Sequence, residues 1–270
     1  MLRNLKDLEG FVIRATDGNI GEIKEFYFND HQWVVRYLVV ETGSWMSSKK
    51  ILLSPISIKD VDWEAKEVVV TISQSQVKNS PDIDTQKPVS RQYEMDYLSY
   101  YGYALYWGDT SLWGGYPSPY MMGPDYLRDD TPATVVDTEV PYVSPKKVSA
   151  DHHLRSNTEV MNYHIKASDG ELGHLQGMLI DPETWAIRYL IINTSNWWLG
   201  HLVLVAPQWI KEVSWSASKV YVDLTQSEIK NAPRYNAGAV FGREAEEALH
   251  RHYGRKGYWE DKSKILDTAI

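Results

Sequence analysis

The feature that most constrains the fold is a long internal repeat. Residues 2–107 align without a gap with residues 154–259, so the two copies are offset by 152 residues, from position 2 to position 154. A unit of this length is too long for a solenoid repeat, so the pattern predicts two copies of one small domain. The aligned motifs include Leu2-Arg3 with Leu154-Arg155, Asp17-Gly18-x-x-Gly21 with Asp169-Gly170-x-x-Gly173, Arg36-Tyr37-Leu38 with Arg188-Tyr189-Leu190, and Tyr106-Trp107 with Tyr258-Trp259.

The repeat divides the 270 residues of the chain into four regions. We expect a first domain over residues 1–107, a second over residues 152–260, and a tail at residues 261–270. Residues 108–151 are rich in Gly, Pro, Tyr and Asp, a composition that indicates a linker. Each domain, at roughly 105 residues, is long enough to close one modest hydrophobic core.

Short β-branched and aromatic segments, separated by turn residues, recur in both copies and predict a small barrel or sandwich. The strands are expected at 11–16, 20–28, 33–41, 50–53, 56–63 and 68–72, and at the equivalent positions of the second copy. Hairpin turns join the first two strands of each copy, and their Asp-Gly sequences favour a structural role over acid–base chemistry. The residues assigned to these turns are Asp17, Gly18, Gly21, Asp169, Gly170 and Gly173.

Helices come after the strands in each copy. Ser73-x-x-Gln76 and Thr225-x-x-Glu228 have the spacing of capping boxes and predict short helices that end before a proline. A longer helix is expected at residues 90–101 and again at residues 242–253. The predicted fold class is therefore mainly β with short helices.

The second copy resembles the PRC-barrel family. The resemblance is carried by Asp169-Gly-Glu-Leu-Gly173, Ile180-Asp-Pro-Glu-Thr184, Ile187-Arg-Tyr-Leu-Ile191, Leu202-Val-Leu-Val-Ala-Pro207 and the stretch from Asp223-Leu-Thr225 to Pro233. The first copy is similar more loosely, at Asp17-Gly-Asn-Ile-Gly21, Val35-Arg-Tyr-Leu-Val39 and Ile51-Leu-Leu-Ser-Pro55. The resemblance implies two six-stranded antiparallel PRC-type β-barrels from an internal duplication, each followed by C-terminal helices.

The resemblance also implies a function. Domains of this family form the cytoplasmic part of the photosynthetic reaction-centre H subunit and the C-terminal half of a ribosome-maturation factor. For this chain the resemblance implies an H-subunit-like, non-catalytic scaffold or adaptor that mediates protein–protein interaction or complex assembly. Two alternatives stay open: a maturation factor associated with the ribosome or another RNA–protein particle, and a module that binds small anions.

The composition argues against several other classes of protein. The chain has no cysteine, so a thiol nucleophile and a thiolate metal site are excluded. It has no Gly-x-Ser-x-Gly turn and no glycine-rich phosphate loop before a helix. We therefore expect no enzyme, no cofactor and no metal. The net charge of −8, without a basic stripe, argues against direct contact with nucleic acid.

The distribution of apolar residues bears on location. No apolar run approaches the ~18–20 residues that span a bilayer. The N-terminal residues 1–7 lack the apolar region of a signal peptide. We expect no membrane insertion and a cytoplasmic location.

Two groups of residues are candidates for binding. Arg36 and Arg188 lie in apolar strands, where a buried guanidinium needs an acidic or carbonyl partner, either in an internal ion pair or in a bound anion. The other group consists of apolar residues in the loop between the third and fourth predicted strands of each copy. It comprises Trp45, Met46, Trp197, Trp198 and Leu199.

An apolar loop tip is typical of an interface anchor, although such a loop can also fold onto its own domain. The partner expected from these residues is a protein of unknown identity. A homodimer is a second expectation, because two similar surfaces are easily self-complementary.

Overall fold

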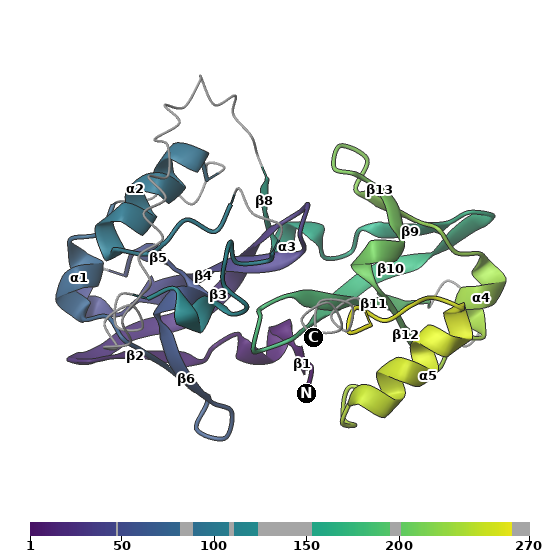
Figure 1. Cartoon of the computed structure of the whole chain (residues 1–270), viewed down its shortest axis with the longest axis horizontal. Helices are drawn as coiled ribbons and strands as arrows, with labels where there is room; N and C mark the ends of the chain where they lie inside the picture. Colours follow the sequence, from purple (N-terminus) through teal and green to yellow (C-terminus); the bar gives the residue numbers. More distant parts are fainter. Residues whose placement is uncertain (47, 82–88, 108–110, 124–152, 195–200, 261–270) are drawn as a thin grey trace, which may run out of the picture. The chain divides into compact units, whose positions relative to one another are not determined.

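The computed structural model describes residues 1–46, 48–81, 89–107, 111–123, 153–194 and 201–260 (Figure 1). The chain forms two compact units. The N-terminal unit comprises residues 8–157 and Glu183–Trp185, and the C-terminal unit comprises Met1–Asp7, Thr158–Pro182 and Ala186–Ile270. Each unit therefore contains short segments from the other copy of the sequence repeat.

The N-terminal unit is built on a seven-stranded sheet, in which six strands have the order β5-β4-β3-β2-β7-β6. The seventh strand, β8, pairs with β3 outside this path. The strands are β2 (Val12–Ala15), β3 (Gly18–Asn29), β4 (Val34–Thr42), β5 (Lys50–Leu53), β6 (Ile58–Asp62), β7 (Glu67–Val70) and β8 (Leu154–Ser156).

The sheet of the C-terminal unit repeats the same order as β12-β11-β10-β9-β14-β13, with β1 paired to β10. Its strands are β1 (Arg3–Asn4), β9 (His164–Ala167), β10 (Gly170–Ile180), β11 (Ile187–Asn193), β12 (Leu202–Val205), β13 (Ile210–Ser214) and β14 (Lys219–Val222). The two copies of the repeat thus form sheets of identical topology.

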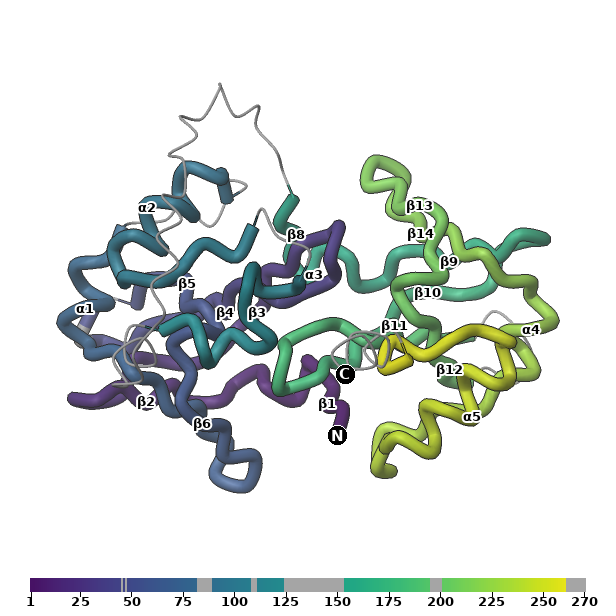
Figure 2. Tube along the Cα trace, in the orientation of Figure 1, coloured from purple at the N-terminus to yellow at the C-terminus, as the bar shows by residue number. Residues whose placement is uncertain are grey.

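The first strand of each copy completes the sheet of the other unit. Arg3 and Asn4 pair with Ile180 and Leu179. Arg155 and Ser156, which lie 152 residues later in the repeat, pair with Phe28 and Tyr27. The acceptor positions are also 152 residues apart, so the exchange is reciprocal and in equivalent register. It can be traced along the colours of the tube in Figure 2.

The expectation of six-stranded, wholly antiparallel, closed barrels is wrong in three respects. Each sheet has seven strands because of the exchange, and β2 pairs parallel with β7, as β9 does with β14. Within the described residues, β5 and β6 share no ladder that would close the sheet. A 3-10 turn at Pro55–Ser57 separates them without reversing their sense, which makes β7 parallel to β2. Proline lacks the N–H that a continuing ladder would need.

The predicted helices are confirmed. The capping boxes begin α1 (Gln74–Lys78) and α4 (Gln226–Lys230), and in each the two reciprocal hydrogen bonds are present. The longer helices are α2 (Arg91–Tyr101) and α5 (Arg243–Tyr253), each ended by a glycine in the left-handed conformation. A further short helix, α3 (Asn157–Val160), comes directly after β8. None of the helices in the described ranges is both long enough and apolar enough to cross a bilayer.

Aromatic residues from two other segments complete the N-terminal unit. Trp113, from the stretch after the first repeat, is fully buried, and its indole N–H donates to the carbonyl oxygen of Thr184 at 2.6 Å. Trp185 is also buried, and its indole N–H donates to the Tyr120 hydroxyl at 2.9 Å. Residues 183–185 are therefore part of this core, although they lie in the second repeat.

Candidate functional site: two buried arginine–glutamate clusters

The Asp-Gly turns connect the first hairpin to the short helix. Asp17 Oδ1 accepts a 2.7 Å hydrogen bond from the backbone N–H of Gln74, and Asp169 does the same for Gln226. A Cβ at Gly21 would collide with the carbonyl oxygen of Glu41, so this close approach of two strands requires glycine. The turn residues therefore have a packing and capping role, and none of these contacts leads to a ligand.

Arg36, in the middle of β4, is almost completely buried. Its Nη2 donates to the Leu112 carbonyl oxygen at 2.7 Å and to Gln32 Oε1 at 2.5 Å. The guanidinium lies 3.9 Å from the ring centre of Tyr106 and 4.4 Å from that of Trp113. Burial lowers the pKa of Arg36 to about 9, and the nearby carboxylate of Glu94 opposes that shift. The arginine thus remains a cation at neutral pH, held by a carbonyl, an amide and two aromatic rings.

The carboxylate of Glu94, on α2, has no exposed surface and is the acceptor centre of the N-terminal cluster. Its Oε1 accepts hydrogen bonds from the hydroxyls of Tyr37, at 3.4 Å, and Tyr106. Its Oε2 lies 3.0 Å from Arg91 Nη1 and 2.7 Å from His153 Nε2. Burial, with the charge of Glu94 second, raises the pKa of Tyr37 well above its usual range, so this hydroxyl stays a donor.

The C-terminal unit has an equivalent cluster. Arg188 Nη2 donates to Asp181 Oδ2 at 3.0 Å, and its guanidinium lies 3.9 Å from the ring centre of Tyr258. Glu246 Oε1 accepts from Tyr258, at 2.9 Å, and from Tyr189. Burial raises the pKa of Glu246, although the tyrosine hydroxyls and nearby arginines oppose the shift. Burial also raises the pKa of Tyr258 to about 12.

The second cluster also includes a histidine, His250, which contacts a tyrosine hydroxyl of the cluster, whereas His153 contacts the carboxylate of the first cluster. His250 Nδ1 lies 2.9 Å from the Lys256 carbonyl oxygen, which can only accept, so Nδ1 carries a proton. The neutral ring then accepts at Nε2 from the Tyr189 hydroxyl, 2.9 Å away, so the single hydrogen of this hydroxyl is shared between His250 and Glu246 Oε1, at 3.2 Å. Burial lowers the pKa of His250, which favours this neutral form. In the N-terminal cluster the corresponding helix position is Leu98, and the histidine comes instead from residue 153.

The clusters bring together residues that the sequence interpretation did not connect. Arg36 and Arg188 were candidates, but Glu94, Glu246 and their helix partners Arg91 and Arg243 were missed. The signal was present in the repeat, because Arg-x-x-Glu recurs at residues 91–94 and 243–246. All these charged groups face one another inside their own unit, an arrangement that holds the C-terminal segment of each repeat against its sheet.

The histidine of the C-terminal cluster predicts a pH dependence of stability. Since the folded chain lowers the pKa of His250, the unfolded chain binds its proton first as the pH falls. The stability that neutral His250 contributes is therefore present above the ordinary histidine pKa of about 6.5 and is lost as the pH falls through it. His250→Leu, which installs the residue of the other repeat, is expected to flatten the change in unfolding midpoint between about pH 7.5 and pH 5.5.

Urea unfolding of the wild type and His250→Leu at both pH values measures this effect. The other histidines are present in both proteins, so only the difference between the two pH dependences reports on position 250. Equal pH dependences would contradict the assignment of His250 as a neutral acceptor.

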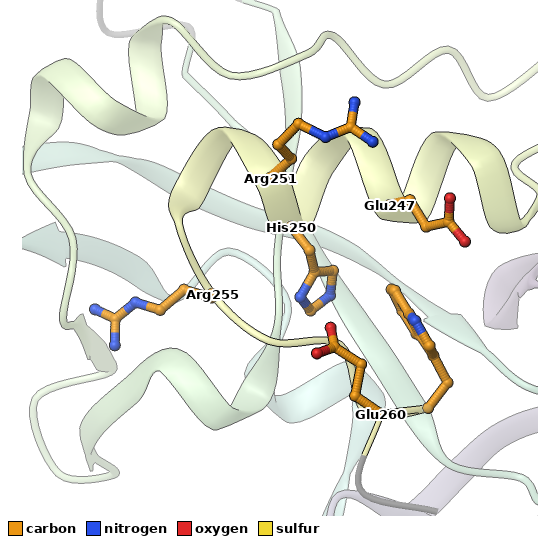
Figure 3. A pocket seen from close by; sticks show the side chains of 6 residues that line it. Glu247, His250, Arg251, Arg255 and Glu260 are labelled. Atoms are coloured by element: carbon orange, nitrogen blue, oxygen red, sulfur yellow. The ribbon is translucent and has the colours of Figure 1, made fainter. Parts of the chain in front are cut away.

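A cavity of about 330 Å³ opens beside the C-terminal cluster (Figure 3). Its charged lining is mixed in sign. Arg255 is engaged by Asp223 at 3.1 Å, and Glu260 accepts a 2.8 Å hydrogen bond from the Gly257 backbone. Figure 3 shows the side chains of Arg251 and Arg255 pointing away from His250 and from each other. The cavity therefore offers no convergent set of cations for a bound anion.

The apolar loop candidates lie mostly outside the described residues. This applies to Trp197, Trp198 and Leu199 and to the side chain of Trp45. Met46, at the end of a 3-10 turn over Ser44–Met46, is half-buried. Both loops connect equivalent strands, β4 to β5 and β11 to β12.

Comparison with known proteins agrees with the fold. The family model of the PRC-barrel domain matches residues 2–77, which span β1 to β7 and most of α1. No protein among the curated sequences matches the chain. The C-terminal unit has the strand order of the N-terminal unit and is consistent with a tandem arrangement. Residues 2–77 belong to the PRC-barrel domain family.

Proposed function

We propose that this chain is a tandem PRC-barrel protein, derived by duplication, that acts as a non-catalytic adaptor for protein partners. The observation that carries the proposal is the PRC-barrel match at residues 2–77 together with a second sheet of the same strand order. The buried clusters support it, because their arginines and glutamates contact groups of their own unit and serve its architecture. Proteins that share a fold can have different functions, so the proposal is tested by replacing residues of the proposed binding surface.

The proposed binding surface consists of the two equivalent apolar loops, at residues 45–46 and residues 197–199. One loop joins β4 to β5 and the other joins β11 to β12, and each contains tryptophan. Tryptophan is enriched among the residues that dominate binding energy at protein interfaces. A partner that contacts both loops would gain from two linked sites, since the second contact forms at a high effective concentration.

We expect a Trp45→Ala/Trp197→Ala/Trp198→Ala variant to lose a partner that the wild type captures. Loss of one anchor at an interface costs about 2 kcal/mol or more, so a triple replacement should reduce capture at least ~30-fold. The measurement is affinity capture from native lysate, including detergent-solubilised membranes, with quantitative mass spectrometry. The matched control is Tyr100→Ala/Leu105→Ala, which removes exposed apolar side chains elsewhere. A partner retained by the triple variant, or lost equally in the control, would contradict this surface.

A further inference from the structure

The edge of β3 holds the strand β8 through more than backbone pairing. Asp30 donates its backbone N–H to the carbonyl oxygen of His153 at 2.9 Å, which extends the ladder by one residue. At the other end, Asn157 Oδ1 accepts from the backbone N–H of Phe26 at 2.8 Å. We name residues 153–157 the donor segment and the β3 edge from Glu25 to Asp30 the acceptor edge.

The acceptor edge is acidic where the donor segment offers proton donors. Arg155 Nε lies 3.0 Å from Asp30 Oδ2, and Ser156 Oγ donates to Glu25 Oε2 at 2.7 Å. A third carboxylate, that of Glu94 in the N-terminal cluster, has its Oε2 atom 2.7 Å from His153 Nε2. The two carboxylates of the edge, together with that of Glu94 on α2, favour an extended segment with an imidazole, a guanidinium and a hydroxyl at these positions.

The equivalent edge in the C-terminal unit has a different chemistry. The position of Glu25 is occupied there by Gly177, and that of Asp30 by Pro182. Asn4, the counterpart of Ser156, places its Oδ1 only 3.6 Å from where a Cβ of Gly177 would lie. The two donor segments share an arginine, because Arg3 is the counterpart of Arg155, but Asn4 replaces Ser156 and Met1 replaces His153. The hydroxyl and the imidazole that reach carboxylates in the N-terminal unit are therefore particular to residues 153–157.

We propose that the acceptor edge is a strand-binding site that also takes the donor segment from a second copy of this chain. The contacts that hold residues 153–157 are the same whichever chain supplies them. Whether the donor segment comes from the same chain or from a second chain then depends on the effective concentration of the tethered segment compared with the concentration of the chain. Strand exchange produces dimers when the second of these is comparable to the first. This inference concerns self-association and does not rest on the proposed adaptor function.

The ion pair between Arg155 and Asp30 allows a charge-swap experiment on the full chain. Asp30→Arg alone places two arginines together, and Arg155→Asp alone places two aspartates together. When the two variants are mixed, reciprocal exchange places the arginine introduced at position 30 of one chain beside the aspartate introduced at position 155 of the other, and the native Asp30 beside the native Arg155. An opposite-charge pair is then restored at both acceptor edges of the heterodimer, and like charges meet at neither. The double variant, Asp30→Arg/Arg155→Asp, restores the pair within one chain and is the matched control.

The variants are unfolded, mixed at about 0.5 mM chain and refolded. This concentration is near the effective concentration that a flexible tether provides. The molecular mass of the products is then measured by light scattering and native mass spectrometry. We expect the mixture to form a heterodimer of twice the 31.1 kDa chain mass and each variant alone to remain monomeric. The double variant, whose ion pair can also form within one chain, should show a smaller dimer fraction than the mixture. The dimer fraction should rise with chain concentration. A mixture that stays at the monomer mass would overturn the proposal.

A second measurement remains informative if a charge variant does not fold. The chain has no cysteine of its own, so Tyr27→Cys and Ser156→Cys, at directly paired positions, can report strand contact by disulfide formation. Mixed single variants should give a covalent heterodimer clearly more abundant than Tyr27→Cys mixed with the exposed control Ser99→Cys. Equal yields would likewise overturn exchange between chains.

Discussion

Replacing Glu94 by alanine is expected to lower the free energy of unfolding of the N-terminal unit by about 3–5 kcal/mol. The reason is the number of groups that depend on this carboxylate. Two tyrosine hydroxyls would lose their acceptor, and Arg91 and His153 would lose the anion beside them. Removing one partner of a buried ionic network leaves uncompensated charge, which costs more than the net worth of the network.

Thermal unfolding measures this change, at roughly 3 °C per kcal/mol for a unit of this size, so the midpoint should fall by about 10 °C. The control is Glu64→Ala, an exposed glutamate in the turn between β6 and β7, for which the change should stay within about 0.5 kcal/mol. Glu94→Gln should lie between the two, because the amide keeps an acceptor for the tyrosines but not the charge. A Glu94→Ala midpoint equal to that of Glu64→Ala would show that the cluster does not stabilise the unit.

The second large effect is expected from leucines of the first 3-10 helix. Leu5 and Leu8 are both buried and are the first and last residues of a 3-10 helix (Leu5–Leu8), yet they belong to different units. Leu5→Ala should destabilise the C-terminal unit by about 2–5 kcal/mol, and Leu8→Ala the N-terminal unit by a similar amount. The reason is that residues 1–7 pack with the second repeat through the pairing of β1 with β10.

Amide hydrogen exchange of the full chain distinguishes the two variants, because it reports opening segment by segment. For Leu5→Ala, increased exchange should appear in β10 and β11 while β3 and β4 stay protected. For Leu8→Ala the pattern should be reversed, so each variant is the control for the other. Increased exchange confined to β3 and β4 in both variants would contradict the assignment of residues 1–7 to the C-terminal unit.

Most helices and strands could be predicted from the sequence because their signals are local. The capping boxes at Ser73 and Thr225 contain all the atoms of their reciprocal hydrogen bonds within four residues, and both helices begin where expected. The strands that carry Arg36 and Arg188 were likewise predicted from unbroken β-branched and aromatic runs. The internal repeat strengthened these assignments, since two different sequences had to satisfy one pattern.

Long-range pairing could not be predicted in the same way. Leu2-Arg3-Asn4 does not by itself indicate whether its partner is Tyr27 or Leu179, because the two acceptor edges occupy the same position in the repeat. The side chains that distinguish the edges become informative only once the pairing is known. The sense of β7 was missed for a related reason: it depends on the geometry of the turn at Pro55, and proline fixes only one dihedral angle of that corner. The partner of Arg36 was expected to be a carbonyl or an acid, but its identity, Leu112, lies in a segment without a repeat counterpart.

The completion of each unit by the first strand of the other repeat is the feature on which the rest of the architecture depends. Cross-strand Hα–Hα nuclear Overhauser effects in the full chain test it directly, because they report which residues face each other across an antiparallel pair. We expect contacts from Asn4 to Leu179 and from Ser156 to Tyr27. Contacts from Asn4 to Tyr27 and from Ser156 to Leu179 would show that each repeat keeps its own first strand, and would contradict the exchange.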